Sequence, residues 1–497
     1  MLSVERGRDI SVLLGQALKD AFPLKKAHRQ DLPYNIVQLS RLLTVERAEM
    51  RHPYWASPAM TGAYVHYFLP WNIYRMSRLF SGLHLATPPD DGRYLLLDLG
   101  SGPMTVPVAL WLSCPEWRSK KIVVCAVDCA GHPLQIGKAI LESLARQAGT
   151  EPWEVVPVQS SLEQGIRRAG QIIQKGCTPW LVTAANVLNE LEPLKKVRLG
   201  DEEDADFEKT RLNDITGLVS SMLRHAPKQA RALFIEPGTR LGGLTLMGVR
   251  SMLREEGMHI EAPCHHNGLC PLYRGDDYGD TEDDDLFMQE EEPEHQGPQG
   301  QVSKLAGRSW CHFTFTSIGA PSWLRALAEP TGLAKETLSL SFLLFSAARE
   351  ENQDEEQDGR KTCLRIISQP FSVPRRKGQC RYACSGHGLI LLEDAEKYAS
   401  GTKLSLAQAG ADIAKAPQDA RSGARCLAVD GNGHKGTEVF EESGHHPFAH
   451  KSGRKHEDAG TKSRSFRRHE RGSSQYPKKA AKKNREGSRQ HPKDLGR

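Results

Sequence analysis

The stretch Tyr94-Leu-Leu-Leu-Asp98-Leu-Gly100-Ser-Gly102-Pro103 decides the fold of this chain. A short apolar run that ends in closely spaced glycines is typical of a buried strand that turns tightly into a helix. Glycine has no Cβ, so the backbone can turn sharply there and approach a ligand closely. The next apolar run, 122–127, is β-branched and ends at Asp128. About thirty residues separate Asp98 from Asp128, which fits one strand–helix–strand unit.

The same alternation continues downstream. Apolar runs at 155–158, 180–187, 232–235, 259–262 and 312–316 predict strands, and helical patterns at 106–112, 132–145, 205–224 and 244–255 separate the earlier ones. Such alternation predicts a mostly parallel sheet with helices on both faces. We therefore expect an α/β protein with four parts: a helical N-terminal region (1–88), a Rossmann-like domain (89–330), a small β-rich segment (331–416) and a disordered basic tail (417–497).

Charge is distributed unevenly along the 497 residues. Residues 451–497 carry 16 Lys and Arg against 5 Asp and Glu, a net charge of +11, which leaves −6 for the rest of the chain. This basic tail could add salt-sensitive affinity for RNA phosphates, or it could be a solubilising extension. The run 276–294 holds 11 carboxylates and predicts a solvated loop within a Cys-containing insertion at 263–309.

The N-terminus has no apolar core of a signal peptide, and no stretch is apolar enough to cross a membrane. We expect a reducing compartment, with a bacterial cytoplasm favoured over the mitochondrial matrix because acidic residues near the start are unusual in transit peptides. In such a compartment the 11 cysteines favour metal binding over disulfides.

The glycine turn predicts a cofactor site. Met104 stands where the dinucleotide fingerprint has its third glycine, and Pro103 precedes it. A pyrophosphate needs the bare amides that these residues remove, whereas S-adenosylmethionine has no phosphate. We therefore expect S-adenosylmethionine at Asp98, Gly100, Ser101, Gly102, Asp128 and Asn186, with Asp128 accepting from the ribose hydroxyls. The alternative is an ordinary turn between a strand and a helix.

Asn186-Val-Leu-Asn189-Glu190 follows the fourth predicted strand and would face the methyl donor in such a sheet. Asn189 and Glu190 are the only candidates for catalysis in this segment, and they could equally cap the next helix. The catalytic residues are otherwise unassigned.

Four cysteines, Cys264, Cys270, Cys311 and Cys384, predict a metal site, because thiolates suit zinc and iron–sulfur clusters. Five residues separate the first pair, more than in zinc knuckles, and Pro271 after a cysteine is typical of ferredoxin-type ligation. Spacing leaves zinc and a cluster open. It also leaves Cys380 open as a competitor of Cys384, because residues four apart on a strand face the same side.

With these motifs assembled, the chain resembles a methyltransferase-like family of small-subunit ribosome assembly factors of bacteria and mitochondria. The resemblance covers about residues 35–395. It is carried by Tyr67-Phe-Leu-Pro-Trp, Asp98-Leu-Gly-Ser-Gly-Pro, Asn186-Val-Leu-Asn-Glu-Leu, Glu236-Pro-Gly, Cys264-x5-Cys270-Pro, Trp310-Cys311-His-Phe and Lys377-Gly-x5-Cys384-x3-Gly388.

The resemblance implies a class I S-adenosylmethionine-dependent methyltransferase fold and a 4Fe-4S cluster held by Cys264, Cys270, Cys311 and Cys384. It also implies binding to the small ribosomal subunit and its rRNA, with rRNA methylation as the associated activity. Two alternatives stay open: a small-molecule methyltransferase with a structural zinc, and a catalytically inactive scaffold of the same fold.

Overall fold

The computed structural model describes residues 10–43, 54–83, 85–191, 202–273, 309–347, 362–376, 378–406, 410–428 and 439–441. The acidic run 276–294 and the basic tail 451–497 lie outside these ranges, so the predictions made for them stay predictions.

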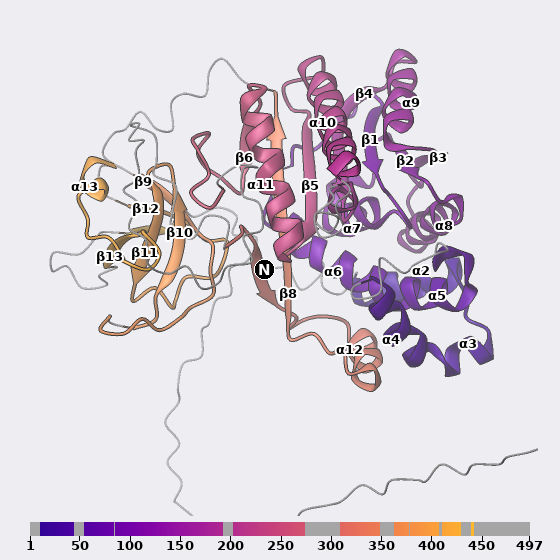
Figure 1. Cartoon of the computed structure of the whole chain (residues 1–497). Coiled ribbons are helices and arrows are strands. Elements are labelled where there is room, and N and C mark those ends of the chain that lie inside the picture. Colours follow the sequence, from indigo (N-terminus) through magenta and orange to yellow (C-terminus); the bar gives the residue numbers. More distant parts are fainter. Residues whose placement is uncertain are drawn as a thin grey trace, which may run out of the picture. The chain divides into compact units, whose positions relative to one another are not determined.

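A central eight-stranded sheet dominates the described residues (Figure 1). Its strands are β1 (Tyr94–Leu99), β2 (Ile122–Asp128), β3 (Glu154–Gln159), β4 (Thr178–Ala185), β5 (Arg231–Pro237), β6 (His259–Ala262), β7 (Phe313–Thr316) and β8 (Thr337–Ser346). Their order is β3-β2-β1-β4-β5-β8-β6, and β7 pairs with β8. Strands β1 to β5 run parallel, whereas β8 is antiparallel to all three of its neighbours. This topology is that of class I S-adenosylmethionine-dependent methyltransferases, as the sequence predicted.

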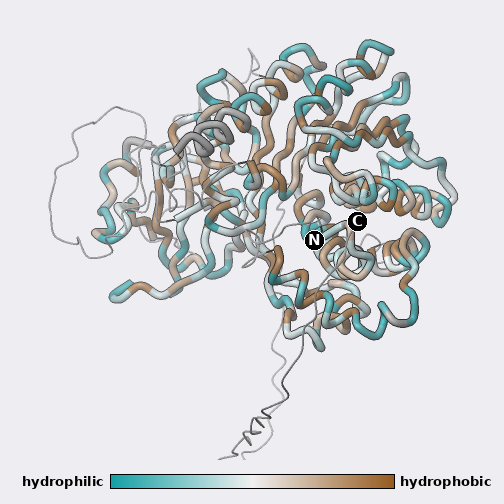
Figure 2. Tube along the Cα trace, turned by 45° about the vertical axis from the view of Figure 1, so that its right-hand side comes forward, coloured by the Kyte–Doolittle hydropathy of each residue, from teal (hydrophilic) through white to brown (hydrophobic). Residues whose placement is uncertain are grey.

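Each face of this sheet is covered by helices because its parallel strands are buried on both sides. Leu96 and Val124 pack in one apolar cluster with α6 (Leu69–Phe80), α7 (Thr105–Ser113) and α8 (Gly131–Ala148). Leu95 and Leu97 point to the opposite face and pack with α9 (Leu162–Gln174), α10 (Glu202–Arg224) and α11 (Arg240–Glu255). Figure 2 shows the hydrophobic segments concentrated in the strands and the hydrophilic ones on the outer helical turns.

The N-terminal region is helical, as expected. Its elements are η1 (Ile10–Leu14), α2 (Gly15–Ala21), α3 (Lys26–Gln30), α4 (Leu32–Leu43), η3 (Tyr54–Ala56), α5 (Pro58–Ala63) and η4 (Tyr64–Phe68). It is tied to the segment that follows β7 by two hydrogen bonds. The Tyr67 hydroxyl donates to the Leu333 carbonyl at 2.7 Å, and the Tyr74 hydroxyl donates to the Ile318 carbonyl at 2.9 Å.

Short helices connect the strands. They are η5 (Pro115–Trp117), η6 (Leu188–Glu190), α12 (Ser322–Ala328), η8 (Glu329–Thr331) and α13 (Gly410–Ala414). No helix in the described part of the chain is long and apolar enough to span a membrane.

A second sheet follows in the order β13-β11-β10-β9-β12-β14. Its strands are β9 (Thr362–Ile366), β10 (Arg381–Ser385), β11 (Gly388–Glu393), β12 (Lys403–Leu406), β13 (Arg425–Ala428) and β14 (Val439–Glu441). Leu364, Ala383, Ile390 and Leu404 form its core.

Two boundaries predicted from the sequence are wrong. The strand at 337–346 is β8 of the central sheet, so the β-rich segment does not begin at 331. Residues beyond 416 are not all disordered, because β13 pairs in parallel with β11. The four residues of β13 are too few to give a period, and only tertiary pairing with β11 makes them a strand.

Candidate functional site

A cavity of about 750 Å³ lies at the carboxyl ends of β1 to β4. Ligands of open α/β sheets bind at this edge, where the strand order reverses. Asp98, Gly100, Ser101, Gly102, Asp128 and Asn186 all line it, so the six predicted cofactor residues are brought together in one place.

The glycine turn fits closely against the segment that follows β4. Gly100 has φ of +63°, and a Cβ there would lie 2.5 Å from Cγ2 of Val187. Gly102 has φ of +52°, and a Cβ there would meet no atom within 4 Å. The first glycine is therefore required for packing, whereas the second leaves bare backbone beside open space.

The two aspartates of the cavity have different environments. Asp98 is 1% exposed and accepts from the hydroxyls of Ser101 and Thr183. Burial raises its pKa to about 7, against the lowering effect of these hydrogen bonds. Asp128 accepts from the backbone amides of Gly102 and Ala130, at 2.9 and 2.8 Å. A carboxylate has about four lone pairs, so Asp128 keeps acceptor capacity for a ligand.

A hydrogen bond from an arginine holds the side chain of Asn186. Arg75 of α6 donates to the Asn186 Oδ1 at 2.9 Å and to the Ser339 carbonyl at 3.1 Å. Burial lowers the pKa of Arg75 to about 10, and Glu236 opposes that shift. No motif in the sequence predicted the role of Arg75, because its partners lie 111 and 264 residues away along the chain.

The catalytic candidates Asn189 and Glu190 are not brought into the cavity lining. Both lie in η6, and the side chain of Glu190 is outside the described residues. Val187 and Leu188, which open this turn, donate their amides to Oε1 of Glu236 at 3.0 and 2.8 Å. Glu236, a fully buried residue of β5, thus positions this turn, a role that the sequence did not predict.

Charge and aromatic character set the chemistry of the cavity. Its described lining holds the two aspartates and no Lys, Arg or His. Tyr54, Trp55 and Tyr64 from the N-terminal helices complete the lining. These three aromatic residues form one wall of the cavity.

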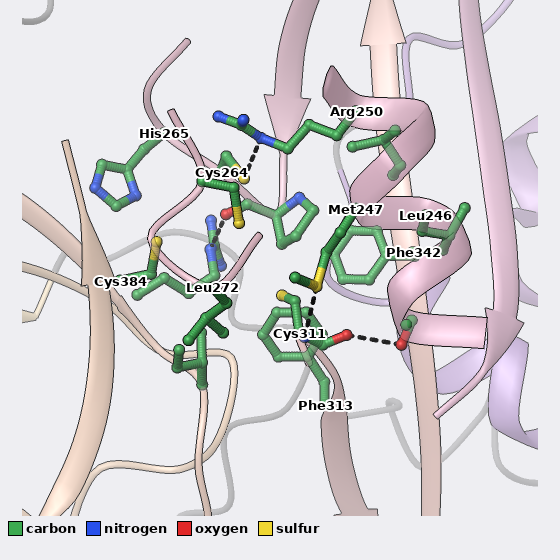
Figure 3. Close-up of a pocket in the computed structure, with 17 residues that line it drawn as sticks. Leu246, Met247, Arg250, Cys264, His265, Leu272, Cys311, Phe313, Phe342 and Cys384 are labelled. Atoms are coloured by element: carbon green, nitrogen blue, oxygen red, sulfur yellow. Dashed lines mark hydrogen bonds between the residues drawn. The ribbon is translucent and has the colours of Figure 1, made fainter. Parts of the chain in front are cut away.

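A second cavity gathers the four predicted metal ligands (Figure 3). Cys264 and Cys270 lie in the loop after β6, Cys311 lies just before β7, and Cys384 lies in β10. Strand β8 forms one side, because β6 and β7 pair with different parts of its length and leave a gap between them. The Ser341 hydroxyl of β8 donates to the Cys311 carbonyl across this gap at 2.7 Å.

Two arginines supply positive charge at these thiols. Arg250 of α11 is 3% exposed and donates from Nε to the Cys264 sulfur at 3.2 Å. Its Nη2 donates to the carbonyls of His266 and Gly268 at 3.1 and 2.8 Å. Arg365 of β9 lines the same cavity and donates to the Pro263 carbonyl.

Burial disfavours charge on the other three thiols. It raises the pKa of Cys270 to about 11, and it raises the pKa values of Cys311 and Cys384 well above the usual range, with neighbouring cysteines adding to the effect. These groups need a bound cation to be held as thiolates.

The structure separates Cys384 from its competitor. Cys384 lines the cavity, and its sulfur lies 3.5 Å from the His266 Nε2. Cys380 is fully buried and does not line that cavity. Its backbone leaves β10 to pair with Phe371, so the regular four-residue alternation assumed from the sequence does not hold.

The described residues contain no group of three or more His, Cys, Asp or Glu side chains arranged to hold one metal ion. A single zinc ion requires four ligands at about 2.0–2.3 Å from one point. The four sulfurs share a cavity without this convergence.

Residues 207–281 match the model of a family described as "Mitochondrial small ribosomal subunit Rsm22". The matched stretch contains β5, α11, β6, Cys264 and Cys270. No curated protein matches the chain.

Several solved methyltransferases match the chain at low similarity. Precorrin-6y C5,15-methyltransferase from Geobacter metallireducens is 10% identical, over 55% of this chain and 87% of that one, with a TM-score of 0.26. The rRNA methyltransferase AviRa from Streptomyces viridochromogenes is 13% identical, over 34% of this chain and 73% of that one, with a TM-score of 0.19. An S-adenosylmethionine-dependent methyltransferase from Clostridium acetobutylicum is 16% identical, over 41% and 58%, with a TM-score of 0.18. At these TM-scores the matches carry no argument about site or substrate.

The raised pKa of Asp98 makes stability depend on pH. Its folded pKa of about 7 exceeds the unfolded value of roughly 4, so the folded state binds the proton more tightly, and this contribution is lost as pH rises towards and through 7. Asp98→Asn should therefore stabilise the protein by about 1–3 kcal/mol at pH 8 and have little effect near pH 4. Urea unfolding at both pH values measures this. An equal effect at both values would contradict it.

Arg250→Met should destabilise the protein by roughly 2–4 kcal/mol, because the partly buried Cys264 thiol and two carbonyls lose their donor. Arg224→Met is the control, since it removes only exposed contacts with Glu256: an ion pair that contributes at most about 1 kcal/mol and a hydrogen bond to the backbone carbonyl. Chemical unfolding of both variants, compared with wild type, measures the difference. Equal losses would show that the Arg250 contacts add nothing specific.

Proposed function

We propose that this protein acts on the small ribosomal subunit as a methyltransferase-fold factor that binds S-adenosylmethionine and rRNA and holds an iron–sulfur cluster. The observation that carries the ribosomal part is the match of residues 207–281 to a small-ribosomal-subunit family. The matched stretch includes α11 and the first two cysteines, which contact the candidate metal cavity.

The electrostatics of the first cavity support S-adenosylmethionine over a phosphorylated cofactor. A lining with two aspartates and no cationic side chain among the described residues attracts a sulfonium and repels a pyrophosphate. Asp128 would accept from the ribose hydroxyls with its remaining lone pairs. When bound, the cofactor supplies an electrophilic methyl group.

The donor set of the second cavity fits an iron–sulfur cluster. Four thiols are the ligands that such clusters use, and two arginines offset the negative charge of a thiolate-ligated centre. A cluster of four irons is wider than one ion and needs its ligands further apart.

We propose binding as the primary function, with rRNA methylation as the reaction that the fold would support. Burial raises the pKa of Asp98 to about 7, but its oxygens already accept from Ser101 and Thr183. The matching family is described as mitochondrial, so we assign a mitochondrial location in place of the bacterial cytoplasm expected from the sequence.

The two cysteines that spacing could not separate provide a matched pair for the cluster. Cys384→Ala should lose most of the iron and sulfide of anaerobically purified protein, and Cys380→Ala should keep both, because only Cys384 lines the cavity. Iron, sulfide and zinc analysis measures this. Zinc without iron in the wild type would overturn the cluster, and iron loss in Cys380→Ala alone would overturn the ligand assignment.

Cofractionation tests the ribosomal role. On sucrose gradients the wild-type protein should migrate with small subunits, and salt should weaken this association because phosphates supply much of the affinity. Binding of S-adenosylhomocysteine, measured by calorimetry, should be retained in the same preparation. Turnover on a soluble substrate without subunit association would instead favour the small-molecule methyltransferase, and association without cofactor binding would favour the inactive scaffold.

A further inference from the structure

The cofactor cavity has two sides because β1 lies between β2 and β4 in the sheet. On one side of the glycine turn are Asp128 and Ser160, at the ends of β2 and β3. On the other side are Asn186 and Val187, which follow β4. Reading the first side as the place of the cofactor's ribose leaves the β4 side for a second ligand, so Asn186, which the sequence assigned to the cofactor, is assigned to that ligand instead.

Three aromatic rings line the same cavity. The Tyr54 and Tyr64 rings stack with their centroids 5.6 Å apart, and the Trp55 ring lies 4.7 Å from both. Tyr64 lines this cavity together with Asn186 and Val187 of the β4 side. We call Tyr54, Trp55 and Tyr64 the aromatic wall. All three side chains are partly exposed, so the wall keeps surface for a further ring.

Arg75 fixes the polarity of Asn186. A guanidinium has donors only, so the group that faces it must be the amide oxygen. The amide nitrogen is then directed away from Arg75, and it has no hydrogen-bond partner among the described residues. Asn186 therefore offers a donor to a ligand in the cavity, and its acceptor is already engaged.

From this arrangement we propose that the β4 side of the cavity is a pocket for one unpaired nucleobase, stacked on the aromatic wall with a carbonyl oxygen or ring nitrogen facing Asn186. The inference rests on the proposed RNA-binding function and specifies its ligand. A base flipped out of RNA is recognised by stacking and by hydrogen bonds to its edge. The cavity has no cationic side chain in its described lining, so the phosphates would stay outside while the base enters.

A hairpin RNA with one bulged nucleotide tests the pocket against the same hairpin with an abasic site at the bulge. Both share their phosphates, so the affinity ratio isolates the base. Full-length wild type, saturated with S-adenosylhomocysteine, should prefer the bulged base by roughly 5- to 150-fold, the range that one stacked base contributes. Fluorescence anisotropy at raised salt reduces the phosphate contribution common to both RNAs.

Variants assign this preference to the wall. Trp55→Leu should bring the ratio close to one, Trp55→Phe should retain most of it, and Asn186→Asp should lower it while keeping a partner for Arg75. Tyr34→Leu is the control, since Tyr34 is 66% exposed on α4 and does not line the cavity. Thermal unfolding confirms that each variant is folded.

A wild-type ratio near one, no measurable binding of either hairpin, or a preference unchanged in Trp55→Leu would each overturn the pocket. So would a Trp55→Leu variant that loses affinity for S-adenosylhomocysteine but keeps the base preference, because the wall would then serve the cofactor. If the wild type cofractionates with small subunits but binds both hairpins with an affinity ratio near one, the pocket is refuted and the ribosomal role is not. A clear base preference without cofractionation refutes the ribosomal role alone.

Discussion

The antiparallel pairing of β8 is the constraint on which both cavities depend. One edge of this strand pairs with β5, and the other edge is shared between β6 and β7. The Ser339 carbonyl anchors Arg75 behind Asn186, and the Ser341 hydroxyl anchors the backbone of Cys311. Ser339 and Ser341 thus hold the β4 side of the first cavity and the base of the second. The backbone of β8 therefore sets the geometry of both cavities.

The two cavities have opposite electrostatics. The first is lined by two aspartates and suits a cationic ligand, whereas the second places two arginines beside thiols and suits an anionic centre. Glu236-Pro-Gly238 lies between them. Its carboxylate holds the amides of Val187 and Leu188, and the Gly238 carbonyl accepts from the indole of Trp310, next to Cys311. The two halves are therefore connected through one short segment.

The sequence could predict the features that depend on residues close together along the chain. The glycine turn, Asp128 and the alternation of strands follow from short-range patterns, and these predicted the fold and the six residues that line the first cavity. The sequence could not give Arg75 or the aromatic wall, because their roles depend on partners far along the chain. It could not choose Cys384 over Cys380 by spacing, because the choice depends on where β10 begins. Strand β8 lies in the segment 331–416 that we expected to form a separate β-rich part, but it joins the central sheet, since apolar alternation does not say which edge a strand will join.

The position of β8 also governs the order in which the protein can be completed during synthesis. Until roughly a hundred residues beyond β5 have left the ribosome, the edge of β5 has no partner and remains an open template for other strands. The sheet carrying the glycine turn is thus translated early but closed late. A nascent chain stalled within the acidic run would expose the unpaired edge of β5. This topology therefore requires that a chaperone bind the chain during translation.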